Sequence, residues 1–250
     1  MASVPMISPE TKRQKRILTE RYWDCLLGDF KSVLLLILQA PLIGWLCTVV
    51  WGSLGSVSPM LYFVLCLSSV WFGAVNACRE IVKERAILQR ESLFGLSSLA
   101  YLLSKFQVLS ILALCQVSLL LMAVEWQLAL PGPFVIQIIT LWFCSIAGVG
   151  LGLTISSFAG NQERAVLSVP ILIIPQILFS EIAVPSHLFG KTMAIAEKLM
   201  PVRWAYDSFL QLAAPTTSWF TVATNLVALT TFPIALGLLS LLSLKFTKST

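Results

Sequence analysis

Residues 134–158 read FVIQIITLWFCSIAGVGLGLTISSF, a stretch without one charged side chain. A helix needs about 20 predominantly apolar residues to cross a hydrocarbon core about 30 Å thick. In that core each backbone amide and carbonyl must find its partner within the protein, which a helix achieves by itself. The stretch therefore predicts a membrane-spanning helix and sets the fold class as an all-α integral membrane protein.

Further apolar stretches lie on both sides of it. The stretch at 165–184 is the weakest, because Pro170 and Pro175 remove helix hydrogen bonds and Glu181 adds a charge. The composition agrees with a membrane protein: 57% of the residues are hydrophobic and 12% are charged, about half the charge of a soluble domain. We expect six transmembrane helices, at about residues 33–51, 59–77, 98–124, 134–158, 165–184 and 221–244.

The N-terminal segment predicts an amphipathic helix and not a secretory signal, because no long apolar core precedes its basic cluster. Leu18, Tyr22, Leu26 and Phe30 recur every four positions, and charged residues fall mainly elsewhere. Such a helix suits the membrane interface; a solvated helix on a soluble partner is the alternative. We expect residues 1–32 to form a cytoplasmic N-terminus with this amphipathic connecting helix, and residues 33–250 to form the six-span domain.

Basic residues predict the side of the membrane on which each loop lies. Of the 17 Lys and Arg residues, all but Lys191, Lys198 and Arg203 fall on the side of the N-terminus when six spans alternate. Lys and Arg collect in cytoplasmic loops. We therefore expect a multi-pass protein of the plasma membrane, in bacteria the inner membrane, with both termini in the cytoplasm. The outer connection at about 185–220 is long yet apolar, which favours short outer helices or a return into the membrane.

A dense charge cluster follows the stretch at 59–77. Seven charged residues lie between Arg79 and Glu91, and each would cost roughly 2.5–3.5 kcal/mol at a membrane centre. We therefore expect this segment to reach water. Its helical spacing and mixed signs favour a docking surface for a partner; a solvated turn that only follows the charge rule is the alternative.

The segment KERAILQRE-SLFG-LSSLAYLLSK resembles the first cytoplasmic loop of type-2 ABC permeases, particularly the ABCG-like group. The family pattern of two glutamates, a glycine, a tyrosine and a lysine falls on Glu84, Glu91, Gly95, Tyr101 and Lys105. Three other segments resemble the same family in the same order: RYWDCLLGDFKSVLLLILQAPLIG, GNQERAVLSVPILIIPQILFSEIAVP and MPVRWAYDSFL. Together they cover nearly the whole chain. The outer loop lacks the cysteines and Asn-x-Ser/Thr sites of many animal members, so the chain looks like a bacterial-type permease.

The resemblance implies that the charged segment is a coupling helix seated in a cleft of an ATP-binding subunit. The residues that would couple to the ATPase are Glu80, Lys83, Glu84, Arg85, Arg90 and Glu91. Glu84 and Glu91 could instead pair with the basic connecting helix, which would be a structural role, and the sequence leaves both readings open.

The resemblance also implies a substrate cavity between the second and fifth spans of two facing subunits, identical or paralogous. The corresponding residues are Phe72, Asn76, Gln176, Phe179 and Glu181, although lipid contact or helix packing is the alternative for each. Apolar and aromatic residues there suit export of a hydrophobic or amphipathic cargo, such as a lipid or glycolipid.

The chain carries no recognisable nucleotide-binding or catalytic motif. Its glycine-rich run at 148–157 lacks the lysine of a P-loop. Gly148, Gly152, Ser156 and Gly160 instead form a ladder of small residues at four-residue spacing, which lets helices approach closely. Six cysteines lie singly, so we expect no metal site and no disulfide framework. We expect no enzyme activity and no cofactor in this chain, with ATP and Mg bound by a partner ATPase.

Two other function classes are less well supported. A secondary transporter would normally place ionisable residues in the middle of its spans, whereas this chain offers only Glu181 near the end of one. A membrane-embedded enzyme would need a catalytic group, and the single histidine, His187, has no nucleophile or acid at a recognisable spacing.

Overall fold

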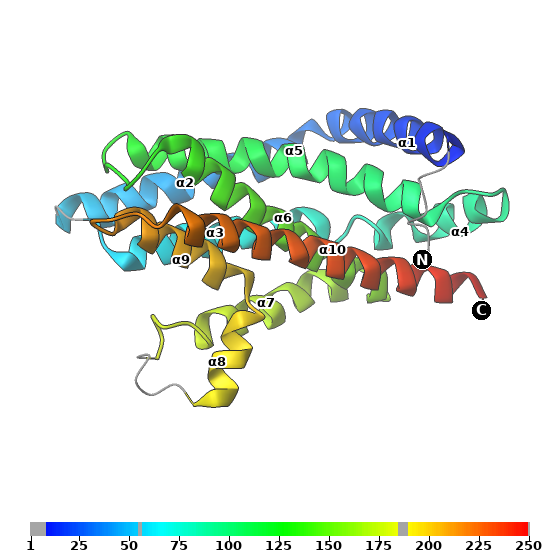
Figure 1. Cartoon of the computed structure of the whole chain (residues 1–250). Coiled ribbons are helices and arrows are strands. Elements are labelled where there is room, and N and C mark those ends of the chain that lie inside the picture. The colour runs from blue at the N-terminus through cyan, green and yellow to red at the C-terminus, as the bar shows by residue number, and fades with distance from the viewer. Residues whose placement is uncertain (1–8, 55–56, 185–189, 250) are drawn as a thin grey trace.

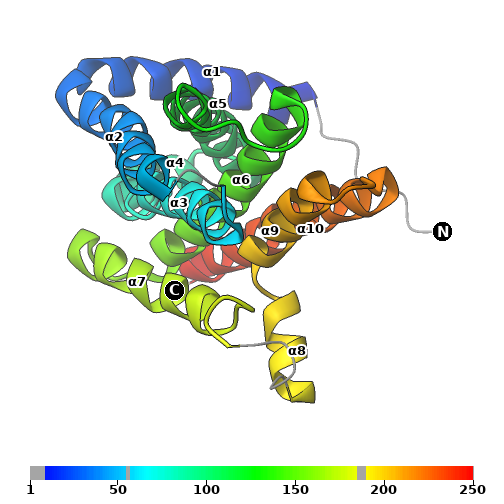
Figure 2. The ribbon, with the colours of Figure 1, turned by 90° about the vertical axis from the view of Figure 1, so that its left-hand side faces the viewer.

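The computed structural model describes residues 9–54, 57–184 and 190–249, and every regular element in that part of the chain is a helix. The long helices α2, α3, α5, α6 and α10 run side by side, with α1 on one side of them and α7 and α8 on the other (Figures 1 and 2). In chain order the elements are α1 (Pro9–Gly28), α2 (Phe30–Leu54), α3 (Pro59–Ala77), the 3-10 turn η1 (Val82–Glu84), α4 (Arg85–Leu93), α5 (Ser98–Glu125), α6 (Phe134–Phe158), α7 (Gln162–Leu178), α8 (Lys191–Lys198), α9 (Pro201–Ala213) and α10 (Trp219–Ser249).

Five of these helices, α2, α3, α5, α6 and α10, are long and apolar enough to cross a membrane. They correspond to five of the six expected spans. The stretch expected at 165–184 becomes α7, which has 17 residues and ends at Leu178. Glu181 therefore lies in the turn beyond the helix, where it is exposed. Pro170 and Pro175 both lie inside α7, and the six-span count stays a prediction.

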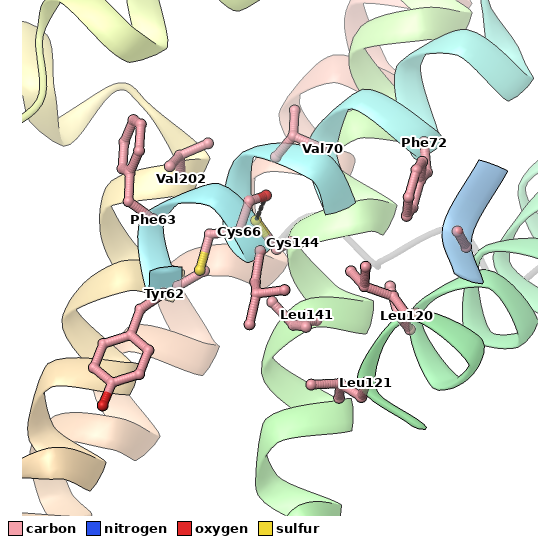
Figure 3. Packing of buried hydrophobic residues seen from close by; sticks show 14 of the residues in the cluster. Tyr62, Phe63, Cys66, Val70, Phe72, Leu120, Leu121, Leu141, Cys144 and Val202 are labelled. Atoms are coloured by element: carbon pink, nitrogen blue, oxygen red, sulfur yellow. Dashed lines mark hydrogen bonds between the residues drawn. The ribbon is translucent and has the colours of Figure 1, made fainter. Parts of the chain in front are cut away.

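The bundle is built around the contact between α3 and α6, and α9 packs against the N-terminal half of α3. Tyr62 stacks on Phe209 with ring centroids 5.6 Å apart, and Phe63 meets Tyr206 edge to face at 6.0 Å. Figure 3 shows Tyr62 and Phe63 at one end of this core and Phe72, between α3 and α5, at the other. The segment expected at the outer surface therefore supplies α9 as part of the apolar core, and before it the short helix α8, whose one buried residue is Glu197.

The N-terminal helix α1 lies along α5. Leu18 and Tyr22 of the expected apolar face are buried there. Phe30 was expected on the same face, but it is 63% exposed because the helix ends at Gly28 and Phe30 begins α2. The apolar stripe of α1 is therefore shorter than predicted, and it packs on protein at Leu18 and Tyr22.

Candidate functional site

The charged segment after α3 is anchored to the end of α6. The Ser156 hydroxyl accepts hydrogen bonds from the backbone amides of Ile81 (2.9 Å) and Val82 (3.0 Å). The Arg85 guanidinium donates to the carbonyls of Ser156 (3.2 Å) and Ser157 (2.9 Å). These bonds satisfy backbone groups where α3 ends and where α6 ends, so the turn between α3 and α4 has a defined path.

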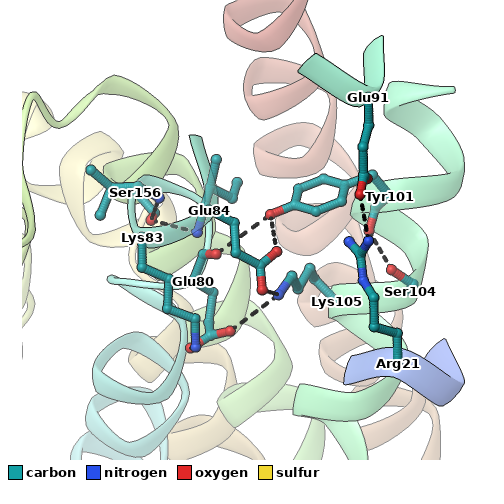
Figure 4. Close-up of polar contacts among 11 residues, drawn as sticks. Arg21, Glu80, Lys83, Glu84, Glu91, Tyr101, Ser104, Lys105 and Ser156 are labelled. Carbon is teal, nitrogen blue, oxygen red and sulfur yellow. Dashed lines mark hydrogen bonds and ion pairs between the residues drawn. The ribbon is translucent and has the colours of Figure 1, made fainter. Parts of the chain in front are cut away.

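A compact ion network lies directly behind this turn (Figure 4). The Lys105 ammonium, on α5, is 2.8 Å from Glu84 Oε1 and 3.4 Å from Glu80 Oε2. Lys83 pairs with the other oxygen of Glu80, and Tyr101 donates a hydrogen bond of 2.9 Å to Glu84 Oε2. Two cations thus balance two carboxylates.

The network corrects one expectation about the charged segment. We expected Arg79–Glu91 to reach water throughout, but Glu80 is only 8% exposed and its partner Lys105 only 2%. Burying a charge is tolerable when it is paired and hydrogen-bonded. The sequence could not place Lys105 beside Glu80, because the two residues belong to different helices.

Helix α1 closes over this network. The Tyr22 ring lies over the Lys105 ammonium, 3.6 Å from ring centroid to Nζ, and Arg21 forms an ion pair of 2.6 Å with Glu91. Burial and then the charge of Glu80 raise the pKa of the Tyr22 hydroxyl well above its ordinary value. Burial opposes the charge on Arg21, but the bond to Glu91 outweighs it and raises the pKa of the guanidinium.

Gln14 of α1 fixes the far end of the same loop. Its carbonyl oxygen accepts from the backbone amide of Ser97 (3.0 Å), and its amide donates to the carbonyl of Gly95 (3.3 Å). Gly95 has φ +89°, a conformation that glycine adopts without strain. Nothing in the spacing of the sequence singled out Gln14, whereas Tyr22 could be found from the four-residue repeat.

The six residues expected to couple to an ATPase thus divide by position. Glu80, Lys83 and Glu84 belong to the network, Arg85 contacts the end of α6, and Glu91 contacts Arg21 of α1. Arg90 is exposed on α4. Three large apolar residues near it are also exposed, beside the polar Gln89: Ile87 at 44%, Leu93 at 84% and Phe94 at 86%. No motif or spacing in the sequence marks these three residues.

The residues expected to line a substrate pathway are spread over two helices. Phe72 and Asn76 are buried on α3, and Asn76 donates to Gln116 Oε1 of α5 at 2.6 Å. Gln176 is buried on α7, where its amide donates to the carbonyl of Leu172 (3.3 Å). Phe179 is partly buried at the end of α7 and Glu181 is exposed beyond it. Asn76 lines a cavity that is described below.

The four residues of the small-residue ladder also have different surroundings. A Cβ atom on Gly148 would lie 2.2 Å from the carbonyl oxygen of Val70, and one on Gly152 would lie 2.5 Å from that of Ala74. Both glycines thus lie directly against α3. Ser156 instead caps the turn, and Gly160 follows the end of α6, with Arg164 Nη1 at 3.7 Å as the nearest atom to an added Cβ.

The remaining expectations concern metals, thiols and the histidine. In the described ranges no group of three or more His, Cys, Asp or Glu side chains could hold a metal ion, and all six cysteines are free thiols. His187 lies outside the described residues.

Two comparisons with known proteins gave matches to this chain. The family model described as "ABC-2 type transporter" matches residues 13–213. The ABC transporter ATP-binding/permease protein Rv1747 of Mycobacterium tuberculosis is 26% identical over 152 residues, which cover 57% of this chain and 17% of that protein. The match therefore spans less than a fifth of the relative's length.

Proposed function

Since the chain is a membrane permease of the ABC-2 type transporter family, we propose that it is the permease component of an ATP-driven exporter of a hydrophobic or amphipathic substrate. The five apolar helices and the family match support the membrane role. ATP and Mg are bound and ATP is hydrolysed by a partner subunit or by a region outside this sequence. The relative's printed name, ATP-binding/permease, supports that division of labour.

The exposed apolar end of α4 carries the proposal that this permease couples to an ATPase. Leu93 and Phe94 lie at the tip of a short helix that the ion network and α1 hold in place. A large apolar side chain in contact with water marks an interaction surface when its neighbours are also apolar. Helix α4 is connected to α3 at one end and to α5 at the other. A surface held rigidly on α4 can therefore transmit a movement of the ATPase to both helices.

In this proposal Arg90 contacts the ATPase directly, while the network residues Glu80, Lys83 and Glu84, together with Arg85 and Glu91, hold the helix at its angle. Both termini and α4 lie in the cytoplasm, and the protein resides in the plasma membrane. Residues 1–32 form the connecting segment and 33–250 the permease domain, with α7 and the residues to 184 as the remaining span.

The proposed transporter has two permease subunits, identical or paralogous. In the dimer, α3 and α7 of one subunit face those of the other, and the substrate path runs between them. Gln176 and Phe179 would line it, with Glu181 near its outer end, while Phe72 and Asn76, which are buried inside the subunit, would support its wall from behind. The mixture of aromatic and amide side chains suits an amphipathic cargo such as a lipid or glycolipid.

Replacing both Leu93 and Phe94 with aspartate tests the docking surface. We expect ATP hydrolysis by the complete transporter in lipid vesicles to fall at least about tenfold, which corresponds to about 1.4 kcal/mol of lost coupling. The matched control is Phe220→Asp, because Phe220 is 81% exposed at the start of α10, the opposite end of the bundle from α4. Full activity of the Leu93/Phe94 variant, or an equal loss in the control, contradicts the docking role.

A charge swap separates the two roles of Glu91. We expect Glu91→Lys alone to lower ATP hydrolysis several-fold, because it faces Arg21 across 2.6 Å. Adding Arg21→Glu restores the ion pair in reverse and should recover most of that activity if Glu91 acts by holding α1 against the loop. Failure of the double variant, with both variants assembled to the same extent in gel filtration, would instead place Glu91 in direct contact with the ATPase.

A further inference from the structure

A cavity of about 240 Å³ lies beneath the elbow between α1 and α2, bounded also by the end of α3, the middle of α5 and the start of α7. Ligand pockets for drug-sized molecules usually measure about 300–1,000 Å³. The cavity is therefore large enough for a polar head group and the first carbons attached to it. It lies at the same level as the charged segment, where the proposed topology places the inner leaflet's head groups.

Charges of both signs line this cavity. Glu80 is paired with both Lys83 and Lys105. Asp29, at the elbow, and Arg79, after α3, also line it, and neither has an ion-pair partner among the described residues. The cavity thus presents one unmatched carboxylate and one unmatched guanidinium, which suits a ligand that carries both charges.

The opposite wall is apolar and continues onto the outside of the bundle. Leu36 of α2 and Leu109 and Leu112 of α5 line the cavity. Next to Leu36 on α2, Leu35 is 71% exposed and Leu38 is 51% exposed, in a helix that is apolar enough to span the membrane. A molecule with its head group in the cavity could therefore lay acyl chains along α2 without leaving the bilayer.

A buried acceptor adds a second polar feature. Asn76 lines the cavity, and its Oδ1 atom is buried with no hydrogen-bond partner in the described part of the chain, although its amide nitrogen bonds to Gln116. A buried polar atom without a partner is unfavourable, because it has lost the hydrogen bond that water would give it. A primary ammonium, which carries three N–H donors, could bond to the Asp29 carboxylate and, with a small side-chain rotation, to Asn76.

We propose that this cavity binds an inner-leaflet aminophospholipid, with its phosphate on Arg79 and its primary ammonium on Asp29. The site goes beyond the transport role, because binding needs neither ATP nor the partner ATPase. A phosphatidylglycerol head group lacks the ammonium, and a phosphatidylcholine head group carries a quaternary nitrogen with no N–H to donate. The proposed geometry therefore predicts that phosphatidylethanolamine binds more tightly than either of these two lipids.

The test uses the full-length protein in detergent micelles supplied with phosphatidylethanolamine, phosphatidylglycerol or phosphatidylcholine, and native mass spectrometry counts the lipids retained. We expect one tightly held phosphatidylethanolamine per chain, retained about tenfold more strongly than either other lipid. Arg79→Gln and Asp29→Asn should each lower that retention about tenfold. Equal retention of phosphatidylglycerol would overturn the proposal, because it would mean that a cation alone selects the lipid.

Matched controls lie within five residues of Asp29 in the chain. Lys31→Gln and Asp24→Asn remove the same charges from exposed positions that do not line the cavity, and they should leave retention unchanged. An equal loss in these controls would show a general surface-charge effect and would also overturn the proposal. The lipid competition in the unmodified protein needs no variant, so it decides the matter even if Arg79→Gln fails to fold.

Discussion

Replacing Lys105 with methionine is expected to lower the free energy of unfolding by about 3–5 kcal/mol, because it leaves the partly buried carboxylate of Glu84 without a cation and removes one of the two cations beside the buried Glu80. Methionine keeps the length and most of the volume of the side chain, so the change removes the charge with little loss of packing. Unfolding by a graded denaturing detergent, followed by tryptophan fluorescence, measures the difference.

The matched control is Lys83→Met, which removes a cation from the same Glu80. Lys83 is far more exposed than Lys105, with a side chain 38% accessible, so we expect a loss below about 1 kcal/mol. Equal losses in the two variants would mean that burial of the network contributes nothing. Adding Glu84→Gln to Lys105→Met should recover part of the stability, since the uncompensated charge on Glu84 is then removed.

Replacing Gly148 with alanine should also be severely destabilising, by about 1–3 kcal/mol or more. The added methyl group would meet the Val70 carbonyl oxygen at 2.2 Å, and a Cβ on Gly73, across the same interface, would meet that of Ser145 at 2.0 Å. Neither obstacle is a flexible side chain, so α3 and α6 must move apart along their length. The yield of folded protein after detergent extraction and its unfolding midpoint both report the effect.

Gly237→Ala provides the control for this change. Gly237 lies inside α10, and an added Cβ would meet Phe106 Cε2 at 3.6 Å, an ordinary contact. Alanine favours a helix over glycine by about 0.5–1 kcal/mol, so this variant should be neutral or slightly more stable. A Gly148 variant as stable as the Gly237 variant would show that α3 and α6 are not held at this separation.

Some residues of the candidate site could be predicted from the sequence, but their contacts could not. Glu80, Lys83 and Glu84 attracted notice because charge is costly beside a membrane span, and the family resemblance added Tyr101 and Lys105 to them. Their partnership could not be read from the sequence, because Glu84 and Lys105 are on separate helices. For the same reason nothing in the sequence marked Gln14, and Ser156 was predicted only as a small packing residue, although both bind backbone groups of the loop.

Some features of this protein follow from the sequence by itself. The bilayer demands long uncharged helices, so the positions of α2, α3, α5, α6 and α10 are evident from where charge is missing. Local chemistry also limits the helix ends: Pro59 begins α3, and the Asn161 side chain accepts a hydrogen bond from the amide of Arg164 at the start of α7. These effects act between residues that are close together in the chain, so they can be predicted from the sequence.

Only the tertiary structure decided which charges are buried, which glycines are crowded and which apolar residues face water. It placed Lys105 inside the protein, moved Phe30 off the packed face of α1, and ended α7 before Glu181. It also separated Gly148, pressed against α3, from Gly160, which has room for a methyl group. The burial of Lys105 and the crowding of Gly148 depend on the distance between segments far apart in the chain, and hydrophobic pattern and charge along one segment carry no information about that distance.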